Sequence, residues 1–389
     1  MNISLLIATS EEHFRESIHD GLQNVSNAKI VATYPEVSSN LYIRVLQDLE
    51  RYPEAALIID LAGDVEGALK SLEKVKQAAP DVYVIASNYH ADGETVLASL
   101  RAGCNDFLVQ PVKRTEFRNV LTRLERTPRR AASGESHLGR IYSFLGAKGG
   151  VGTTTLAVNF AAALAQREQQ AVLVDLDFSA NDCAMQMGCS PQHNLEEVGE
   201  NLSRMDQALF EAFVARDPLG FYLVGPPDQP EQHIRFSEPM FRELGGFLVE
   251  KYQAVVIDAG RHLADEIVLA ALQTSSMTFL VITQNFPAIR AAQRVIGAMM
   301  RLGFHQDQLK IIVNQSQKRP DANLATLEQI RQTLNQPVFA SIPASPAALA
   351  AVNRGRPFSV DRNNGGDLER AFRGFVDKAV GVRAVAQSA

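Results

Sequence analysis

Short apolar runs alternate with longer amphipathic segments through the first third of the chain. Apolar runs of this length are typical of buried strands, and the longer mixed segments are typical of helices. The pattern predicts a doubly wound parallel α/β sheet, whose function lies at the carboxyl ends of its strands. We expect strands at Ile3–Ala8, Lys29–Ala32, Ala55–Asp60, Val82–Ser87 and Asp106–Val109, and helices at Glu11–Leu22, Ser38–Leu49, Val65–Ala79, Asp92–Ala102 and Lys113–Arg126.

The pattern stops at residues 127–139 (TPRRAASGESHLG), where small, polar and turn-forming residues predict a linker. It resumes from residue 140 to the end of the chain, which predicts a second α/β domain after the first at 1–126. We expect strands at Ile141–Leu145, Phe221–Val224 and Thr278–Thr283, and helices at Thr154–Gln166, Phe241–Glu250, Ala288–Leu302, Leu324–Leu334 and Asp367–Val380.

Composition narrows the class of protein. Hydrophobic residues make up 46% and charged residues 21%, which is ordinary for a globular protein. The net charge of −6 argues against a dedicated nucleic-acid-binding protein. No stretch reaches the ~18–20 apolar residues that span a bilayer, so we expect a soluble protein whose membrane association is at most peripheral or through partners.

A glycine-rich loop follows the first apolar run of the second domain. Glycines allow the backbone to approach an anion, and the N–H groups at a helix start favour negative charge. A strand, such a loop and a helix start together predict a phosphate site. The residues expected to bind the phosphates are Lys148, Gly149, Gly150, Val151, Gly152, Thr153, Thr154 and Thr155.

Aspartates end two later apolar runs: Asp175 and Asp177 in AVLVDLD, and Asp258 in AVVID. Carboxylates at strand ends near a phosphate loop suit Mg²⁺, which prefers oxygen ligands. One carboxylate of the Asp-x-Asp pair can hold a metal-bound water while the other orients a nucleophilic water.

The loop GAKGGVGTTT resembles the deviant Walker A motif of ParA/MinD-type ATPases, usually GKGGxGK[ST]. The resemblance implies a SIMIBI-type P-loop NTPase fold, a parallel sheet flanked by helices, with ATP and Mg²⁺ as cofactors. It places Lys148 at the signature lysine and Thr154 at the magnesium-ligating hydroxyl, with Asp175 and Asp258 holding the metal through water.

The same resemblance assigns the remaining site residues. Asp177 matches the residue that orients the attacking water, so Lys148 and Asp177 are the expected catalytic pair. Asn314, in LKIIVNQS, and Pro343, in ASIPASP, match positions on the adenine side of the family's site.

Two positions of the loop depart from the motif: Ala147 replaces its first glycine, and Thr153 replaces the usual P-loop lysine. The P-loop lysine neutralises charge that develops on the phosphates during hydrolysis. Electrostatic contacts of this kind stabilise a transition state by about 3–4 kcal/mol, or about 10²–10³ in rate. We therefore expect ATP binding with slow or negligible hydrolysis. In the family the signature lysine crosses a nucleotide-sandwich dimer, so Lys148 implies a nucleotide-dependent homodimer.

Residues 1–126 resemble a flavodoxin-like response-regulator receiver domain. Asp60 matches the phospho-acceptor of that family. However, Thr9 and Ser10 stand where the family has an acidic pair after the first strand, and Gln110 stands where it has a lysine before the proline of the fifth strand. Phosphorylation of an aspartate needs magnesium and a neutralising cation. We expect a pseudo-receiver that serves as a docking or dimerisation surface, with Asp60 not phosphorylated.

A degenerate receiver followed by a ParA/MinD-like domain resembles the TadZ/CpaE family. This resemblance implies a cytoplasmic localisation factor, at a cell pole or the inner-membrane face, for Flp (tight-adherence) pilus assembly. It implies the secretion ATPase and inner-membrane pilus components as partners and no specific nucleic acid. The alternatives are an active ParA/MinD-type partitioning ATPase that hydrolyses ATP, and a response-regulator-type signalling protein.

The expected last helix carries apolar residues at Leu368, Phe372, Phe375 and Val376. MinD proteins end in an amphipathic membrane-targeting helix, but this segment also carries two aspartates among its basic residues. We expect it to pack against the sheet instead of binding a membrane surface.

Overall fold

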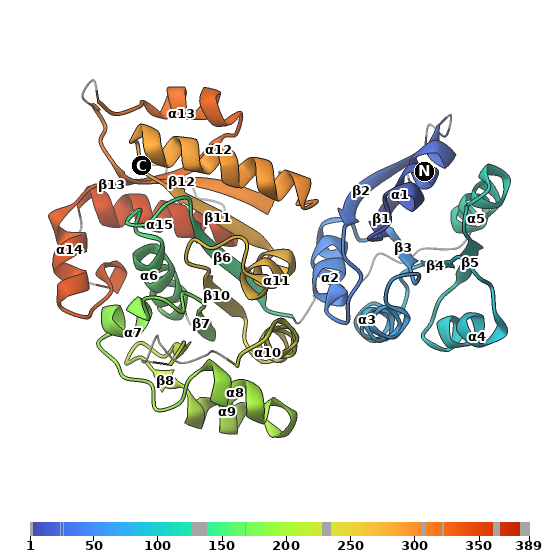
Figure 1. Ribbon diagram of the computed structural model, residues 1–389, viewed down its shortest axis with the longest axis horizontal. Coiled ribbons are helices and arrows are strands. Elements are labelled where there is room, and N and C mark those ends of the chain that lie inside the picture. Colours follow the sequence, from blue (N-terminus) through green and yellow to red (C-terminus); the bar gives the residue numbers. More distant parts are fainter. Residues whose placement is uncertain are drawn as a thin grey trace, which may run out of the picture. The chain divides into compact units, whose positions relative to one another are not determined.

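The computed structural model describes residues 3–23, 25, 27–126, 138–167, 169–227, 235–304, 308–320, 323–360 and 366–381. The chain divides into two compact units, Met1–His137 and Leu138–Ala389 (Figure 1). Most of the expected linker, 127–137, lies outside the described residues.

The N-terminal unit is a five-stranded sheet in the order β2-β1-β3-β4-β5, and all its strand pairs are parallel. This is the flavodoxin-like order of a doubly wound sheet. Its strands are β1 (Ile3–Ala8), β2 (Ala28–Tyr34), β3 (Ala56–Asp60), β4 (Val84–Asn88) and β5 (Asp106–Val109). Its helices are α1 (Glu12–Leu22), α2 (Leu41–Arg51), α3 (Val65–Ala78), α4 (Gly93–Arg101) and α5 (Arg114–Arg126).

Helices cover both faces of this sheet. Helices α1 and α5 pack together on one face, while α2, α3 and α4 form a row on the other (Figure 1). Phe14, Ile18 and Phe117 join the inner side chains of β1, β3 and β4 in one core. The α/β class and all five strand–helix units expected from the sequence are confirmed, with ends that differ by at most three residues.

The C-terminal unit is an eight-stranded sheet in the order β13-β12-β11-β6-β10-β7-β9-β8. Only the edge pair β8–β9 is antiparallel among the described strand pairs of this sheet. Its strands are β6 (Arg140–Gly146), β7 (Ala171–Asp175), β8 (Ala215–Arg216), β9 (Tyr222–Val224), β10 (Ala254–Asp258), β11 (Met277–Ile282), β12 (Leu309–Ser316) and β13 (Val338–Pro343).

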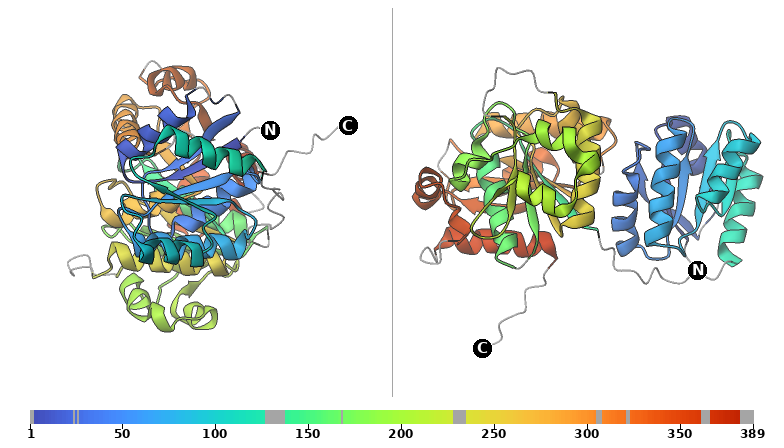
Figure 2. Two further views of the ribbon diagram at one scale, coloured as in Figure 1. Left: turned by 90° about the vertical axis from the view of Figure 1, so that its right-hand side faces the viewer. Right: turned by 90° about the horizontal axis from the view of Figure 1, so that it is seen from below.

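Two layers of helices enclose the C-terminal sheet, as Figure 2 shows from two further sides. Helices α6 and α15 pack on one face, and α10, α11, α12 and α13 on the other. The α-helices are α6 (Thr153–Ala165), α7 (Asp182–Met187), α8 (Leu195–Asn201), α9 (Gln207–Phe213), α10 (Glu238–Lys251), α11 (Glu266–Thr274), α12 (Phe286–Arg301), α13 (Leu327–Leu334), α14 (Pro346–Asn353) and α15 (Asp367–Val380). Short 3-10 helices lie at η1 (Leu202–Arg204) and η3 (Phe358–Val360).

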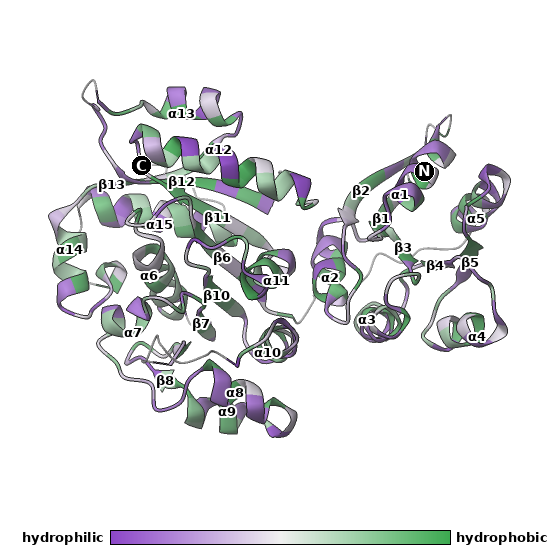
Figure 3. Ribbon diagram, viewed as in Figure 1, coloured by the Kyte–Doolittle hydropathy of each residue, from purple (hydrophilic) through white to green (hydrophobic). Residues whose placement is uncertain are grey.

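Hydropathy follows these layers. Strands β7, β10 and β11 consist mostly of hydrophobic residues, whereas outer helices such as α12 carry hydrophilic residues on one side (Figure 3). Fully buried parallel strands have this continuous apolar character because both of their faces are covered.

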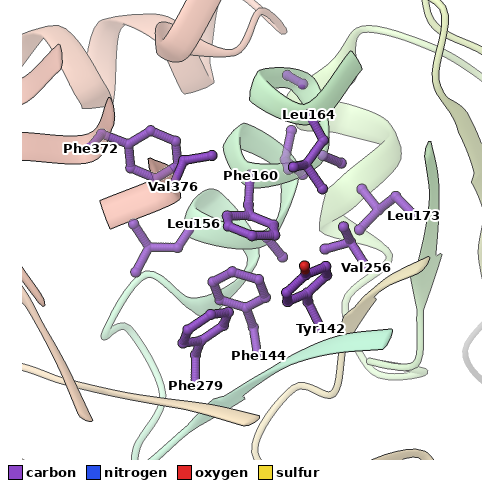
Figure 4. Close-up of a cluster of buried hydrophobic side chains, with 14 of the residues drawn as sticks. Tyr142, Phe144, Leu156, Phe160, Leu164, Leu173, Val256, Phe279, Phe372 and Val376 are labelled. Carbon is purple, nitrogen blue, oxygen red and sulfur yellow. The ribbon is translucent and has the colours of Figure 1, made fainter. Parts of the chain in front are cut away.

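An aromatic cluster joins the central strands to α6 and α15 (Figure 4). The rings of Phe144 and Phe279 lie 4.8 Å apart, and Phe375 from α15 packs 5.0 Å from Phe279. This packing confirms that the last helix lies against the sheet. Among the described residues, no helix combines the length and apolar character needed to cross a membrane.

Candidate phosphate-binding cleft

The loop between β6 and α6 has the backbone of an anion cradle. Gly150 and Gly152 have φ angles of 78° and 87°, a left-handed region that favours glycine. Gly152 is the N-cap residue, so α6 begins at Thr153 directly after the turn. The N–H groups of the first helical turn have no partner within the helix and favour an anion beside them.

Neighbouring strand ends hold this loop in place. The Gly146 N–H donates to the Gly260 carbonyl at 2.7 Å, and the Ala147 N–H donates to the Val281 carbonyl at 3.0 Å. From β12, Asn314 Nδ2 donates to the Val151 carbonyl at 2.8 Å. Three strands therefore fix the loop, two of them through backbone atoms.

A cleft of about 840 Å³ lies at the loop, within the usual size range of ligand sites. Its lining brings together residues that are far apart in the sequence and that were expected in one site. These are Lys148, Gly149, Gly150, Gly152, Thr153, Thr154, Thr155, Asp177, Asn314 and Pro343. Val151, also expected there, is 3% exposed and does not line the cleft.

Asp175 and Asp258 end neighbouring strands in register and are both fully buried. Asp175 accepts hydrogen bonds from the N–H groups of Asp177 (2.9 Å) and Cys183 (3.3 Å). The Cys183 Sγ lies 3.7 Å from Asp258 Oδ2. One ligand atom each from Asp175, Cys183 and Asp258 all lie within 4.8 Å of one another.

Burial raises the pKa of both carboxylates, so each holds its proton more strongly than an exposed aspartate does. Burial raises the pKa of Asp175 well above its usual range, and the charge of Asp258 raises it further. Burial also raises the pKa of Asp258 to about 6, although a hydrogen bond with the Thr154 hydroxyl opposes that rise. Two buried carboxylates and an adjacent hydroxyl are a donor set that suits Mg²⁺. The residues present therefore fit the metal.

The two carboxylates of the Asp-x-Asp pair point to different places. Asp175 lies in the buried cluster, whereas Asp177 lines the cleft and accepts a 2.5 Å hydrogen bond from the Ser179 hydroxyl. The sequence suggested that both lie near the phosphates, and the structure separates a buried position from an accessible one.

Thr153 lies at the base of the loop, and its side chain carries no charge. The residue is 9% exposed, and its Oγ1 is 2.5 Å from the position that a Cβ on Gly146 would take. Among the described residues that line the cleft, Lys148 and Arg261 are the two with cationic side chains. The sequence did not point to Arg261 or to Cys183. The only sequence signal for Arg261 is a basic residue three positions after a strand-ending aspartate.

In the N-terminal unit, Asp60 ends β3 and is 1% exposed. Its Oδ2 accepts a hydrogen bond from Thr9 Oγ1 at 2.6 Å. Its Oδ1 accepts from Gln110 Nε2 at 2.7 Å and from the Ala62 N–H at 3.0 Å. Both oxygens thus accept from neutral donors, two of which are the residues that depart from the receiver pattern.

Comparison with known proteins gives the C-terminal unit its relatives. Residues 142–358 match the family model "CobQ/CobB/MinD/ParA nucleotide binding domain". The septum site-determining protein MinD of Thermotoga maritima is 25% identical over 246 residues, which are 61% of this chain and 89% of that protein. A putative MinD of Emiliania huxleyi is 27% identical over 231 residues, 58% of this chain and 81% of that protein.

Solved structures share the fold of this unit. A ParA family ATPase from Chlorobium tepidum superposes with a TM-score of 0.57 at 20% identity, over 62% of this chain and 98% of that one. The septum site-determining protein MinD complexed with Mg-ADP, from Pyrococcus horikoshii, superposes with a TM-score of 0.51 at 18% identity. The superposition covers 62% of this chain and 96% of that one. Because the family model spans more than half of the sequence, this chain belongs to the CobQ/CobB/MinD/ParA nucleotide-binding family.

Proposed function

We propose that this chain binds ATP with Mg²⁺, dimerises through the bound nucleotide, and hydrolyses it slowly or not at all. One observation carries the proposal: a family phosphate cleft is complete in its backbone, while Thr153 stands at the base of its loop without charge. Backbone binding groups remain in such a site, and the group that neutralises developing charge is missing.

In the proposed complex, the loop and the first turn of α6 bind the phosphates through N–H groups. Thr154, Asp175 and Asp258 hold Mg²⁺, the aspartates through water. The metal, when bound, offsets phosphate charge and the repulsion between the two buried carboxylates. Asn314 and Pro343 contact the adenine.

We attribute the slow turnover to the missing positive charge at Thr153, since a residue that can orient the attacking water is present. Asp177 lies on the cleft wall, where it is available to orient an attacking water. The Thr153 hydroxyl offers one neutral hydrogen bond, so the transition state lacks stabilisation worth about 3–4 kcal/mol. Lys148 is the retained lysine, and we assign it to the phosphates of the partner in the dimer.

Substitution of Lys148 tests the dimer. With Lys148→Ala we expect weaker ATP binding and loss of the ATP-dependent increase in mass, measured by calorimetry and analytical ultracentrifugation. Lys251→Ala, an exposed lysine in the last turn of α10, is the matched control and leaves both unchanged. If Lys148→Ala also leaves affinity and mass unchanged, the lysine does not act across a dimer.

For the cellular role we propose a TadZ/CpaE-like localisation factor for tight-adherence pilus assembly. In this role residues 1–126 are a pseudo-receiver for docking or dimerisation, 127–139 a linker and 140–389 the ATP-binding domain. The flavodoxin-like sheet and the neutral donors around Asp60 support the first part. The secretion ATPase and inner-membrane pilus components are the proposed partners, at a cell pole or the inner-membrane face of the cytoplasm.

The alternative is an active partitioning ATPase, favoured by the MinD and ParA relatives and by Asp177 in the cleft. It predicts rapid turnover and an ATP-dependent, salt-sensitive shift of duplex DNA. Our proposal predicts neither. A signalling response regulator is a third role, and phosphotransfer to Asp60 from acetyl phosphate would support it.

A further inference from the structure

Arg261 projects from the loop after β10 toward the glycine loop. A Cβ placed on Gly149 would lie 2.7 Å from Arg261 Nη1, so the guanidinium lies directly against the Gly149 backbone. Glycine at position 149 leaves the space that this side chain occupies. Arg261 and Lys148 both line the cleft, next to the residues expected to bind phosphate.

The backbone that carries Arg261 is fixed to the phosphate loop. The Gly260 N–H donates to Asp258 Oδ1 at 3.1 Å, and the Gly260 carbonyl accepts from the Gly146 N–H at 2.7 Å. Gly260 has a φ of 55°, and a Cβ there would lie 3.1 Å from the Asp177 carboxyl carbon. This turn therefore directs Arg261 back over the loop, which distinguishes it from an ordinary surface arginine.

The charge of Arg261 is available to a ligand. The residue is exposed, and the described residues include no carboxylate in a salt bridge with it. A guanidinium is always charged, and its planar set of donors matches two phosphate oxygens at once. An exposed arginine without a carboxylate partner, beside a phosphate loop whose own lysine is replaced, points to an anion.

We propose that Arg261 binds the phosphate chain of the nucleotide and supplies part of the positive charge that Thr153 does not. This inference rests on the proposed nucleotide site and adds to it a binding residue from the strand-β10 loop. A cation at this position compensates in part for the missing loop lysine, because the Arg261 guanidinium lies against the Gly149 backbone within the same cleft.

Calorimetric titration of the full chain with Mg-ATP tests the proposal. Arg261→Ala weakens binding roughly tenfold to hundredfold, the range expected for a charge-assisted contact. Arg261→Lys keeps the charge without the planar fork and gives an intermediate loss. Arg301→Ala, an exposed arginine at the end of α12, is the matched control and leaves affinity unchanged.

A double-variant cycle separates replacement of the lysine charge from a general surface effect. Thr153→Lys recovers most of the affinity lost in Arg261→Ala, whereas in the unaltered chain it gains much less. Equal gains in the two backgrounds, or an Arg261→Ala variant that binds like the unaltered chain, would overturn this inference alone. An unaltered chain that binds no Mg-ATP would overturn the proposed function and this inference with it.

Discussion

Asp60 and Asp258 occupy equivalent places in the two units, and their surroundings differ in one respect. Each is a buried aspartate at the carboxyl end of a central parallel strand. The oxygens of Asp60 accept from Thr9, Gln110 and a backbone N–H, and no second carboxylate touches them among the described contacts. Asp258 lies beside Asp175, and the charge of Asp258 raises the pKa of Asp175.

The comparison separates a carboxylate whose hydrogen bonds are completed within the fold, called a closed site below, from a carboxylate pair that attracts a proton or a cation. A single buried carboxylate with neutral donors on both oxygens, and no second carboxylate beside it, is satisfied within the fold and has no need of a metal. A buried pair of carboxylates carries negative charge that only protons or a cation can neutralise.

Asp258→Asn removes one of the two carboxylates of the proposed metal site. We expect it to abolish Mg²⁺-dependent ATP binding, a loss of at least about 100-fold, because buried metal ligands act together. Asp60→Asn is the matched control at the equivalent position of the other unit, and it leaves ATP affinity unchanged. Calorimetry with and without Mg²⁺ measures both. Unchanged Mg²⁺-dependent ATP binding in Asp258→Asn would contradict a metal site at Asp258.

The stability of the nucleotide-free C-terminal unit depends on pH through the same aspartate. The folded-state pKa of Asp258 is raised to about 6, so the folded chain holds a proton that the unfolded chain has already released. The contribution of Asp258 to the free energy of unfolding is therefore greatest below about pH 4 and is lost as pH rises through about 6. The loss is on the order of 2–3 kcal/mol. Thermal unfolding at a series of pH values measures it.

Asp258→Asn is the control for this pH dependence. It should remove the part of the pH dependence that Asp258 contributes and raise the Tm of the C-terminal transition above pH 6 by several degrees, while the raised pKa of Asp175 leaves the remaining pH dependence. An identical pH profile in the unaltered chain and in Asp258→Asn would show that the buried pair does not hold the proton.

Asp60→Ala tests the closed site. The substitution leaves the Thr9 hydroxyl and the Gln110 amide without their buried partner, so it destabilises the N-terminal unit by about 1–3 kcal/mol. Urea unfolding followed in the N-terminal unit measures the loss, while ATP affinity serves as the internal control. Incorporation of phosphate from acetyl phosphate into the unaltered chain would contradict the closed-site interpretation.

Asn314→Leu separates two roles of one residue. Its amide holds the Val151 carbonyl, and its proposed partner in the complex is adenine. If the amide supports the phosphate loop, the variant loses about tenfold in affinity for both Mg-ATP and inorganic tripolyphosphate. A loss confined to Mg-ATP would assign Asn314 to adenine alone.

Much of the fold follows from local patterns. Strand β5 and helix α15 have the limits that their apolar residues predict, and the glycine loop predicts the start of α6 within one residue. Helices α7, α8, α9, α11 and α14 were not predicted. They are six to nine residues long, and such short segments depend on packing more than on their own periodicity.

The site was predictable only where its residues belong to motifs. Strand-end position predicted Asp175, Asp177 and Asp258 because parallel strands end at one edge of a sheet. It did not predict that Asp175 points into the buried cluster, or that Arg261 lies over Gly149. Those placements depend on side-chain direction and on a turn at Gly260, which arise only from the assembled tertiary structure.

We propose that the cleft has kept nucleotide binding and lost turnover at Thr153. Single-turnover hydrolysis of Mg-ATP, with protein in excess so that all nucleotide is bound, tests it directly in the unaltered chain and in Thr153→Lys. We expect both proteins to bind ATP and Thr153→Lys to hydrolyse it about 10²–10³ times faster. Equal rates in the two proteins would contradict it.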